Sequence, residues 1–351
     1  LKPNLSLVRG GKLSNAEFAA LTFDDKLAHL KGVSVRRRME LIVEDNDGKQ
    51  LTKGLSPQEF YLMVKDIGAT DVAQLLANCS AEQLSFTLDL ELWGKWEFNN
   101  ERAITWLEYL LSGDEADAMV LLSRLDPELI QLVLLDEISV GGGTGELATD
   151  YERTEEWDHS FDSMYFITFR NNKHARLIGT LLDIIFRYDR ALYLDLMEGC
   201  RSAVKCEIED MCYQFRSGRL ADLGFPSYEQ AIEIYSPLSP DANKGGDEKI
   251  PLVNDAGNAV TANLPVDDDT LVSRVLASEM TESLRQELGG LLNAAMVAEG
   301  GCGIDEDSAR SVHKRVYGWL NLALEYLCGS DESAASMVVR QEPLKRLFQR
   351  G

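Results

Sequence analysis

The sequence is poor in the residues from which metal and redox sites are built. Its 351 residues include six cysteines and four histidines. No two cysteines have the C-x-x-C spacing of zinc ribbons or thioredoxin-like sites, and no histidine has a second one four positions away. We therefore expect reduced, buried thiols, and we expect neither a metal site nor a bound cofactor.

Positive charge and long apolar runs are also scarce. Lysine and arginine number 35 against 58 aspartates and glutamates, which gives a formal net charge of −23. Such a chain cannot rely on neutralising phosphates, so nucleic acid and anionic membrane surfaces are poor partners. No uninterrupted apolar window of about 18 residues and no leader segment is present. We expect a cytoplasmic protein that does not insert into membranes.

Recognisable catalytic motifs are missing as well. Glycines at positions 141, 142, 143 and 145 suggest a phosphate loop, but the expected third glycine is replaced by Glu146 and no Gly-Lys-Ser/Thr follows. The sequence has no Gly-x-Ser-x-Gly elbow either. These absences predict no catalytic residue, although an enzyme of unrecognised type stays open as a third hypothesis.

What the sequence does contain is a series of short segments that begin with helix-capping residues. Ser14 precedes Glu17 at the capping-box spacing, Pro57 stands at a first helical position, and Ser80 opens another helix. Helices this short are not stable alone in water, so they must stack and share a core. The pattern predicts a mainly α fold of armadillo-like stacked short helices. The predicted helices lie at about 15–20, 23–31, 34–45, 57–67, 70–78, 81–90, 100–112, 114–124 and 127–138.

The second half is predicted to hold at most a small β-sheet element. Residues 139–160 contain a glycine cluster among polar residues and indicate a linker. The aromatic segment Phe161–Phe169 is the best strand candidate, and its expected partner lies in 250–266. A flexible connection is expected near 236–269, which holds four of the nine prolines. The predicted domains are a stacked-helix superhelical domain at 1–138 and a second helical domain at 161–351.

Clearer helices follow the strand candidate. A helix is predicted at 177–188, and a longer helix or a kinked pair from 190 to about 223. The latter should stop at Gly224-Phe225-Pro226, because glycine can take the left-handed conformation and proline prevents continuation. Apolar stripes at 284–296 and 312–327 indicate two further core helices. A last amphipathic turn is cut short at Gly351, so we expect the natural chain to continue.

One segment recurs within the chain. Leu107-Glu108-Tyr109-Leu110 and the Ser-Gly-Asp-Glu that follows are similar to Leu324-Glu325-Tyr326-Leu327 and its Gly-Ser-Asp-Glu. Six of the nine positions from 107 to 115 are identical in the second copy. A recurring packing unit and chance convergence of two helical hairpins both explain the match.

The densest polar cluster lies beside the predicted helix stop. Its candidate residues are Glu209, Arg216, Arg219 and Asp222, which bring both charges next to a fixed backbone turn. One interpretation is an ion-pair network that orients two helices, and the other is a pocket for a ligand or a partner. We take these four as candidate interaction or structural residues.

Two family resemblances can be stated on these motifs. The segment from Ser56-Pro57-Gln58-Glu59 through Leu90 resembles the superhelical N-terminal domain of MgtE-type magnesium transporters, which implies stacked helices. The longer resemblance is to a family of uncharacterised bacterial proteins, which implies no activity. It rests on Ala20-Leu21-Thr22-Phe23-Asp24-Asp25, Trp106-Leu107-Glu108-Tyr109-Leu110, Arg219-Leu220-Ala221-Asp222-Leu223-Gly224-Phe225-Pro226, Leu322-Ala323-Leu324-Glu325 and Leu344-Lys345-Arg346-Leu347-Phe348.

The sequence therefore favours a non-catalytic cytoplasmic scaffold or adaptor that binds a protein partner. The alternative is a divalent-cation-responsive regulatory module, because the acidic runs Asp267-Asp268-Asp269 and Asp305-Glu306-Asp307 could offer oxygen ligands. Both runs lie at predicted helix starts, where the helix dipole already favours acid. The identity of the partner and the oligomeric state do not follow from the sequence.

Overall fold

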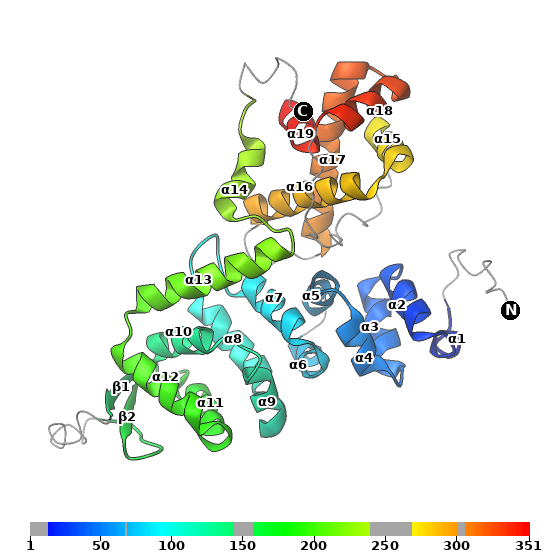
Figure 1. Ribbon diagram of the computed structural model, residues 1–351. Coiled ribbons are helices and arrows are strands. Elements are labelled where there is room, and N and C mark those ends of the chain that lie inside the picture. The colour runs from blue at the N-terminus through cyan, green and yellow to red at the C-terminus, as the bar shows by residue number, and fades with distance from the viewer. Residues whose placement is uncertain (1–12, 67–68, 144–156, 239–268, 301–305) are drawn as a thin grey trace.

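The computed structural model describes residues 13–66, 69–143, 157–238, 269–300 and 306–351 (Figure 1). Within these residues the chain forms 19 α-helices, a short 3-10 helix and a two-stranded sheet. The predicted mainly α class is confirmed. Among the described residues, no helix combines the length and the apolar character needed to cross a membrane.

The first ten helices follow one another with short connections. They are α1 (Asn15–Ala19), α2 (Phe23–Lys31), α3 (Val35–Glu44), α4 (Gly48–Gly54), α5 (Pro57–Asp66), α6 (Ala69–Asn78), α7 (Ala81–Glu91), α8 (Asn100–Leu110), α9 (Glu115–Leu122) and α10 (Pro127–Glu137). Nine of these match predicted segments, and α4 was not predicted. The caps explain the starts: Ser80 Oγ accepts the Gln83 N–H at 3.1 Å, and Gln83 Oε1 accepts the Ser80 N–H at 2.9 Å.

Helices two positions apart in this series pack side by side. α3 contacts α5, α4 contacts α6, α5 contacts α7, and α6 contacts α8. The helices therefore succeed one another across the lower half of Figure 1. Each short helix gains most of its stability from its neighbours and little from its own propensity.

A small antiparallel sheet follows α10 directly. β1 (Ile138–Gly142) pairs with β2 (Tyr165–Phe169), with Ile138 opposite Phe169 and Gly142 opposite Tyr165. The second half of the predicted strand segment is thus a strand. Among the described residues β2 pairs with β1 and forms one further bridge, between His159 and Ile167, whereas the expected partner segment 250–266 lies outside the described residues.

The chain then returns to helices. These are α11 (Ala175–Tyr188), α12 (Arg190–Ser202), α13 (Lys205–Asp222), α14 (Tyr228–Ile232) and the 3-10 helix η3 (Glu233–Tyr235). The kinked pair is the alternative that holds, because Ala203 and Val204 are extended between α12 and α13. α13 ends as predicted: Gly224 has φ +79° and the Phe225 N–H donates to the Leu220 carbonyl at 2.8 Å.

The last five helices form a bundle around α17. They are α15 (Leu271–Glu279), α16 (Glu282–Gly300), α17 (Glu306–Cys328), α18 (Glu332–Gln341) and α19 (Leu344–Arg350). α17 contacts each of the other four. In Figure 1 this bundle stands above α13, and α17 also contacts α5 of the first half.

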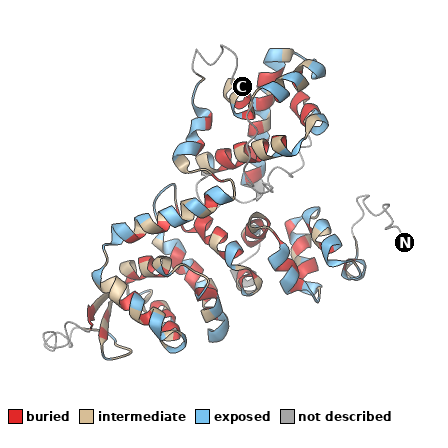
Figure 2. Cartoon of the chain, in the orientation of Figure 1, coloured by how far each residue is buried: buried red, intermediate tan, exposed pale blue. Residues whose placement is uncertain are grey.

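Buried side chains form two clusters, which Figure 2 shows as red faces turned towards neighbouring helices. The first cluster runs from Phe18 to Cys212 and so includes α10, the sheet and α12. The second runs from Leu220 to Phe348 and also takes in Tyr61, Phe86 and Leu90 of the first half. Along the chain, the first cluster thus gives way to the second between Cys212 and Leu220. Residues on both sides of position 138, where the sequence suggested a domain boundary, belong to the same first cluster.

The two copies of the recurring segment adopt similar hairpins. α8 ends at Leu110 and Asp114 caps α9, accepting the Asp117 N–H at 2.9 Å. α17 ends at Cys328 and Asp331 caps α18, accepting the Ala334 N–H at 3.1 Å. The acidic residues that follow each apolar helix end therefore cap the next helix.

Candidate functional site

The predicted polar cluster lies along α13, where this helix crosses the end of α7. Arg216 and Arg219 are one turn apart and both side chains are partly exposed. Each reaches across to α7 and not towards the other candidates. The helix is long enough to place them there because it continues without a break from Lys205 to the stop at Gly224.

Arg219 joins three elements through its guanidinium. Its Nε donates to Asp89 Oδ2 and its Nη2 to Asp89 Oδ1, both at 2.8 Å, in α7. Its Nη1 donates to Oδ2 of Asp126, the residue before α10, at 2.6 Å. Such a two-pronged contact to one carboxylate fixes both distance and orientation. Arg219 therefore holds α13 against α7 and the start of α10.

The Asp89 carboxylate is the buried half of this pair. Asp89 is only 4% exposed. Burial raises the pKa of Asp89 because it disfavours the charged form, and the hydrogen bonds and positive charge of Arg219 oppose that rise. In return, the hydrogen bonds to Asp89 raise the pKa of Arg219. The buried Asp89 carboxylate therefore depends on Arg219 to remain ionised, whereas the guanidinium is charged in either case.

Arg216 extends the same contact by one turn. Its Nε donates to the main-chain carbonyl of Asp89 at 2.7 Å. Its guanidinium carbon lies 5.9 Å from the ring centre of Trp93 and 5.8 Å from that of Tyr213. Arg216 thus closes the end of α7 with a hydrogen bond and packs over aromatic rings.

The other two candidates do not converge on these arginines. Glu209 Oε1 accepts the Phe98 N–H at 3.3 Å, at the far side of the α7–α8 connection. Asp222 is exposed at the end of α13. The four residues therefore do not line one pocket, and the geometry favours the interpretation of a network that orients helices. The sequence offered no signal for Asp89 and Asp126, which lie far away along the chain.

A hollow lies beside Arg216, between the end of α7 and helices α13, α14 and α16. Lys95 Nζ stands 4.7 Å from the ring centre of Tyr228, and the rings of Trp96 and Tyr228 are 5.2 Å apart. Trp96 is 52% exposed, a high value for this residue type. The hollow thus presents cationic and aromatic groups in an acidic chain. It is lined by Leu90, Gly94, Lys95, Arg216, Ser217, Leu220, Pro226, Ser227, Tyr228 and Val297.

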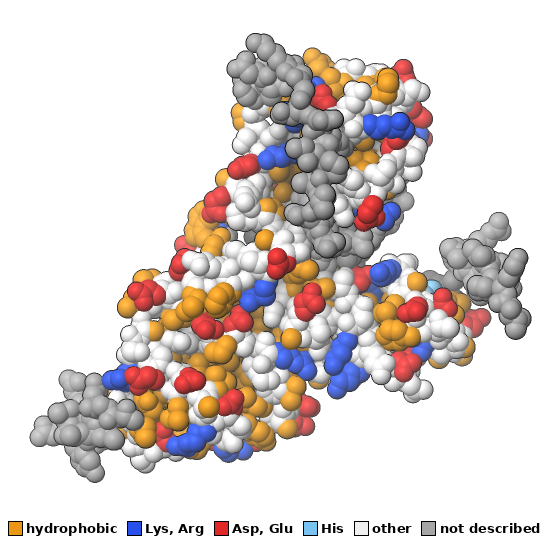
Figure 3. Space-filling view, in the orientation of Figure 1, with side chains coloured by type: hydrophobic (Ala, Val, Ile, Leu, Met, Phe, Trp, Pro, Cys, Tyr) orange, Lys and Arg blue, Asp and Glu red, His pale blue; other side chains and the backbone are white. Residues whose placement is uncertain are grey.

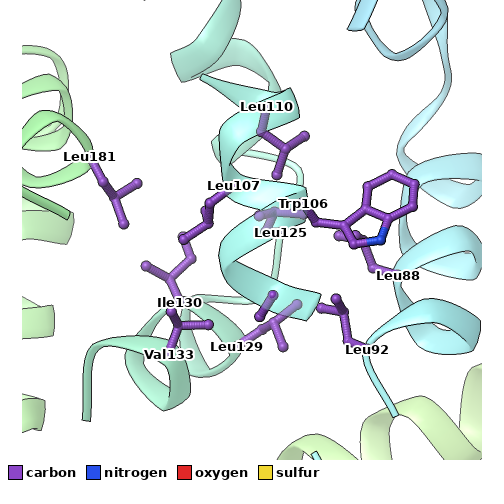
Figure 4. A pocket seen from close by; sticks show the side chains of 11 residues that line it. Leu88, Leu92, Trp106, Leu107, Leu110, Leu125, Leu129, Ile130, Val133 and Leu181 are labelled. Carbon is purple, nitrogen blue, oxygen red and sulfur yellow. The ribbon is translucent and has the colours of Figure 1, made fainter. Parts of the chain in front are cut away.

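A second hollow is wholly apolar. Figure 4 shows its side chains pointing together from α7, α8, α10 and α11, with Trp106 at one side and Leu181 at the other. Apart from the Trp106 indole, its lining side chains carry no hydrogen-bonding group to orient a ligand, and small-molecule sites normally include several such groups. It is lined by Leu88, Leu92, Ala103, Trp106, Leu107, Leu110, Leu125, Leu129, Ile130, Val133 and Leu181.

Metal-binding groups are not gathered anywhere in the described part of the chain. No three histidine, cysteine or acidic side chains there stand close enough to hold a metal ion. Burial raises the pKa of Cys79 to about 11 and that of Cys200 and Cys212 to about 12, so these thiols remain protonated and unreactive near neutral pH. Of the acidic runs, 267–268 and Asp305 lie outside the described residues.

Comparison with known proteins adds a family and no activity. A family model described as "Family of unknown function (DUF6178)" matches residues 15–351. No curated protein and no solved structure matches the chain. The resemblance to an uncharacterised family is therefore supported, whereas the resemblance to MgtE-type transporters gains no support.

Proposed function

The chain belongs to the Family of unknown function (DUF6178), and on that premise we propose that it is a non-catalytic cytoplasmic scaffold or adaptor. It binds another protein through the surface formed by its stacked helices. The observation that carries this proposal is that Arg216 and Arg219 of the polar cluster donate hydrogen bonds to α7 and hold the helices together. These two arginines thus fix neighbouring helices against each other, and a scaffold needs such fixed helices.

The binding surface that we propose is the hollow beside Arg216. Tryptophan, tyrosine and arginine are the residues that most often dominate binding energy at protein interfaces. Trp96 and Tyr228 meet here in an edge-to-face contact, with Lys95 over the Tyr228 ring. On the face in Figure 3 acidic side chains are scattered over the described surface. A partner segment with an acidic or carboxamide-rich tip and one apolar anchor fits this hollow.

A crosslinking experiment tests this proposal. A photoreactive amino acid at position 96 should capture one dominant protein in the cell of origin, and Trp96→Ala should abolish its co-purification. The matched control is position 43, where Val43 is 53% exposed on α3, far from the hollow. Equal capture from both positions, or none from position 96, would contradict a specific interface there.

The alternative function has its own measurement. A cation-responsive module gains stability when its ion binds only the folded chain, by an amount set by the ratio of ion concentration to Kd. The control is a monovalent salt at the same ionic strength. A rise in melting temperature of several degrees at millimolar Mg²⁺ or Ca²⁺ that this salt does not reproduce would replace the scaffold proposal with the cation hypothesis. An unchanged melting temperature is the result that we expect.

A further inference from the structure

The outer face of α17 carries a row of exposed apolar side chains. Trp319 is 38% exposed, Leu322 56% and Tyr326 88%. Their spacing of three and four residues places them on one side of the helix. Gly318 lies on the same side, and a side chain added there would meet nothing within 4 Å. We call Gly318, Trp319, Leu322 and Tyr326 the α17 stripe.

The recurring segment supplies an internal comparison for the α17 stripe. The positions of α8 that correspond to Trp319 and Leu322 are Arg102 and Thr105, which are also exposed, whereas Tyr326 corresponds to Tyr109. Two of the three large apolar positions of the α17 stripe are thus polar in the first copy. Helix formation alone therefore does not require apolar residues there, and contiguous exposed apolar side chains usually mark an interaction surface.

The α17 stripe is complementary to itself. In an antiparallel pair of α17 helices related by a two-fold axis near Leu322, the two Leu322 side chains meet at the centre. Tyr326 then lies at the level of Gly318 and Trp319 of the other copy, where the glycine leaves room beside the exposed part of Trp319, whose ring also stacks on Phe348 of its own chain at 5.4 Å between ring centres. A helix that carried a large side chain at position 318 could not approach as closely.

The charges along α17 favour the same arrangement. Lys314 and Arg315 lie near the middle of α17, whose first residues are Glu306 and Asp307, and Glu325 lies towards its end, with Asp331 just beyond. Antiparallel pairing about Leu322 brings Lys314 and Arg315 of one copy to the level of residues 329–331 of the other, beside Asp331, whereas parallel pairing would place like charges at the same level. Arg315 also pairs with Glu299 of its own chain at 2.9 Å, and its side chain remains 47% exposed.

We propose that two copies of this chain associate through the α17 stripe, antiparallel and with Leu322 on the two-fold axis. One helix face buries less than the roughly 1,600 Å² of a standard interface, which is the size class of weak and transient contacts, so we expect a reversible dimer and design the test for a micromolar Kd. This association is independent of the partner at the Arg216 hollow, because α17 does not line that hollow.

Sedimentation velocity between about 1 and 200 μM tests the dimer, since that range brackets a micromolar Kd. Leu322→Asp should weaken it at least about 100-fold, because two carboxylates would face each other at the axis. The matched control is Thr105→Asp, at the corresponding exposed position of α8, which should leave the dimer unchanged. Unchanged melting curves of both variants establish that they fold.

A symmetric crosslink tests the geometry. Leu322→Cys should form a disulfide-linked dimer under mild oxidation, because a residue on a two-fold axis lies opposite itself. The wild-type protein shows how much crosslinking arises from native thiols, including the exposed Cys206. Thr105→Cys shows how much arises from random collision of an exposed thiol. A chain that stays monomeric throughout the concentration range, a dimer that survives Leu322→Asp, or equal crosslinking at positions 105 and 322 would overturn the proposal.

Discussion

The guanidinium of Arg219 carries three hydrogen bonds to residues far away along the chain. Arg219→Met keeps most of the side-chain volume but leaves the Asp89 carboxylate buried without its partner. Because Arg219 is itself 35% exposed, we expect the free energy of unfolding to fall by about 2 kcal/mol, less than for a fully buried pair. Chemical denaturation followed by tryptophan fluorescence measures this.

The control for Arg219 is another arginine with the same two-pronged contact at the surface. Arg340 donates to both oxygens of Glu279, but its side chain is 68% exposed. Arg340→Met should leave the stability nearly unchanged, because exposed ion pairs contribute little. Equal losses from the two substitutions would show that burial of Asp89 does not matter. Adding Asp89→Asn to Arg219→Met should recover part of the loss.

His313 in α17 is a buried titratable group. It is 3% exposed, its Nε2 has no hydrogen-bond partner among the described residues, and burial lowers its pKa to about 4. Between about pH 6.5 and 4, the imidazole of His313 is therefore protonated in the unfolded chain and neutral in the folded chain. Stability should fall by about 2 kcal/mol as the pH drops through this window.

The substitution His313→Leu separates this contribution from that of the carboxylates. Leucine has a similar volume and no proton to bind, so the variant should lose less stability than wild type between pH 6.5 and 4, while the two differ little in slope above pH 7. The measurement is the urea midpoint at each pH. Parallel curves for the two proteins would mean that His313 titrates normally in the folded chain.

At the scale of single elements, one glycine within α13 and another just past its end have opposite roles. Gly224, just past its end, has φ +79°, a conformation that other residues adopt at a cost. Gly218 lies exposed within the helix, and a Cβ there would meet nothing within 4 Å. We expect Gly224→Ala to lower stability by about 1 kcal/mol and Gly218→Ala to raise it by about 0.5–1 kcal/mol. Thermal unfolding followed by circular dichroism compares them, and the same sign for both would contradict this account of the helix end.

The elements themselves were largely predictable because their start and stop signals are local. The caps at Ser14, Ser80 and Ser227 and the stop at Gly224 need only residues within one or two turns. α4 was missed because it starts at a glycine and has no side-chain cap hydrogen bond. β1 was missed because its five residues follow α10 without a turn and include two glycines.

The candidate site was less predictable for the opposite reason. Glu209, Arg216, Arg219 and Asp222 could be identified as a charged cluster, but their roles depend on which distant residues they meet. Asp89 and Asp126 reach Arg219 only through the tertiary packing of α7 and α10 on α13. Composition and helical periodicity carry no information on such pairs, so the choice between a network and a pocket required the structure.

At the scale of the whole molecule, the two buried clusters meet where α7 touches the turn after α13. Phe86 of α7 and Phe225 of that turn have ring centres 5.6 Å apart, and both are nearly fully buried. Tyr61 of α5 packs edge-on against Phe86 at 6.0 Å. These three rings belong to the second cluster, although two of them come from helices of the first half. The two halves should therefore be coupled in stability.

This coupling yields a prediction about Phe225. Replacing it with alanine removes a buried ring between the halves and should cost about 3 kcal/mol. Hydrogen exchange should then accelerate in α5 and α7 as well as in α15–α19, since the cavity opens onto both. Leu292→Ala, at a site 1% exposed inside α16, removes comparable apolar volume from the second bundle alone and should accelerate exchange only there. If Phe225→Ala leaves α5 and α7 unchanged, the halves are stable independently, and the contact between Phe86 and Phe225 orients them without joining their folding.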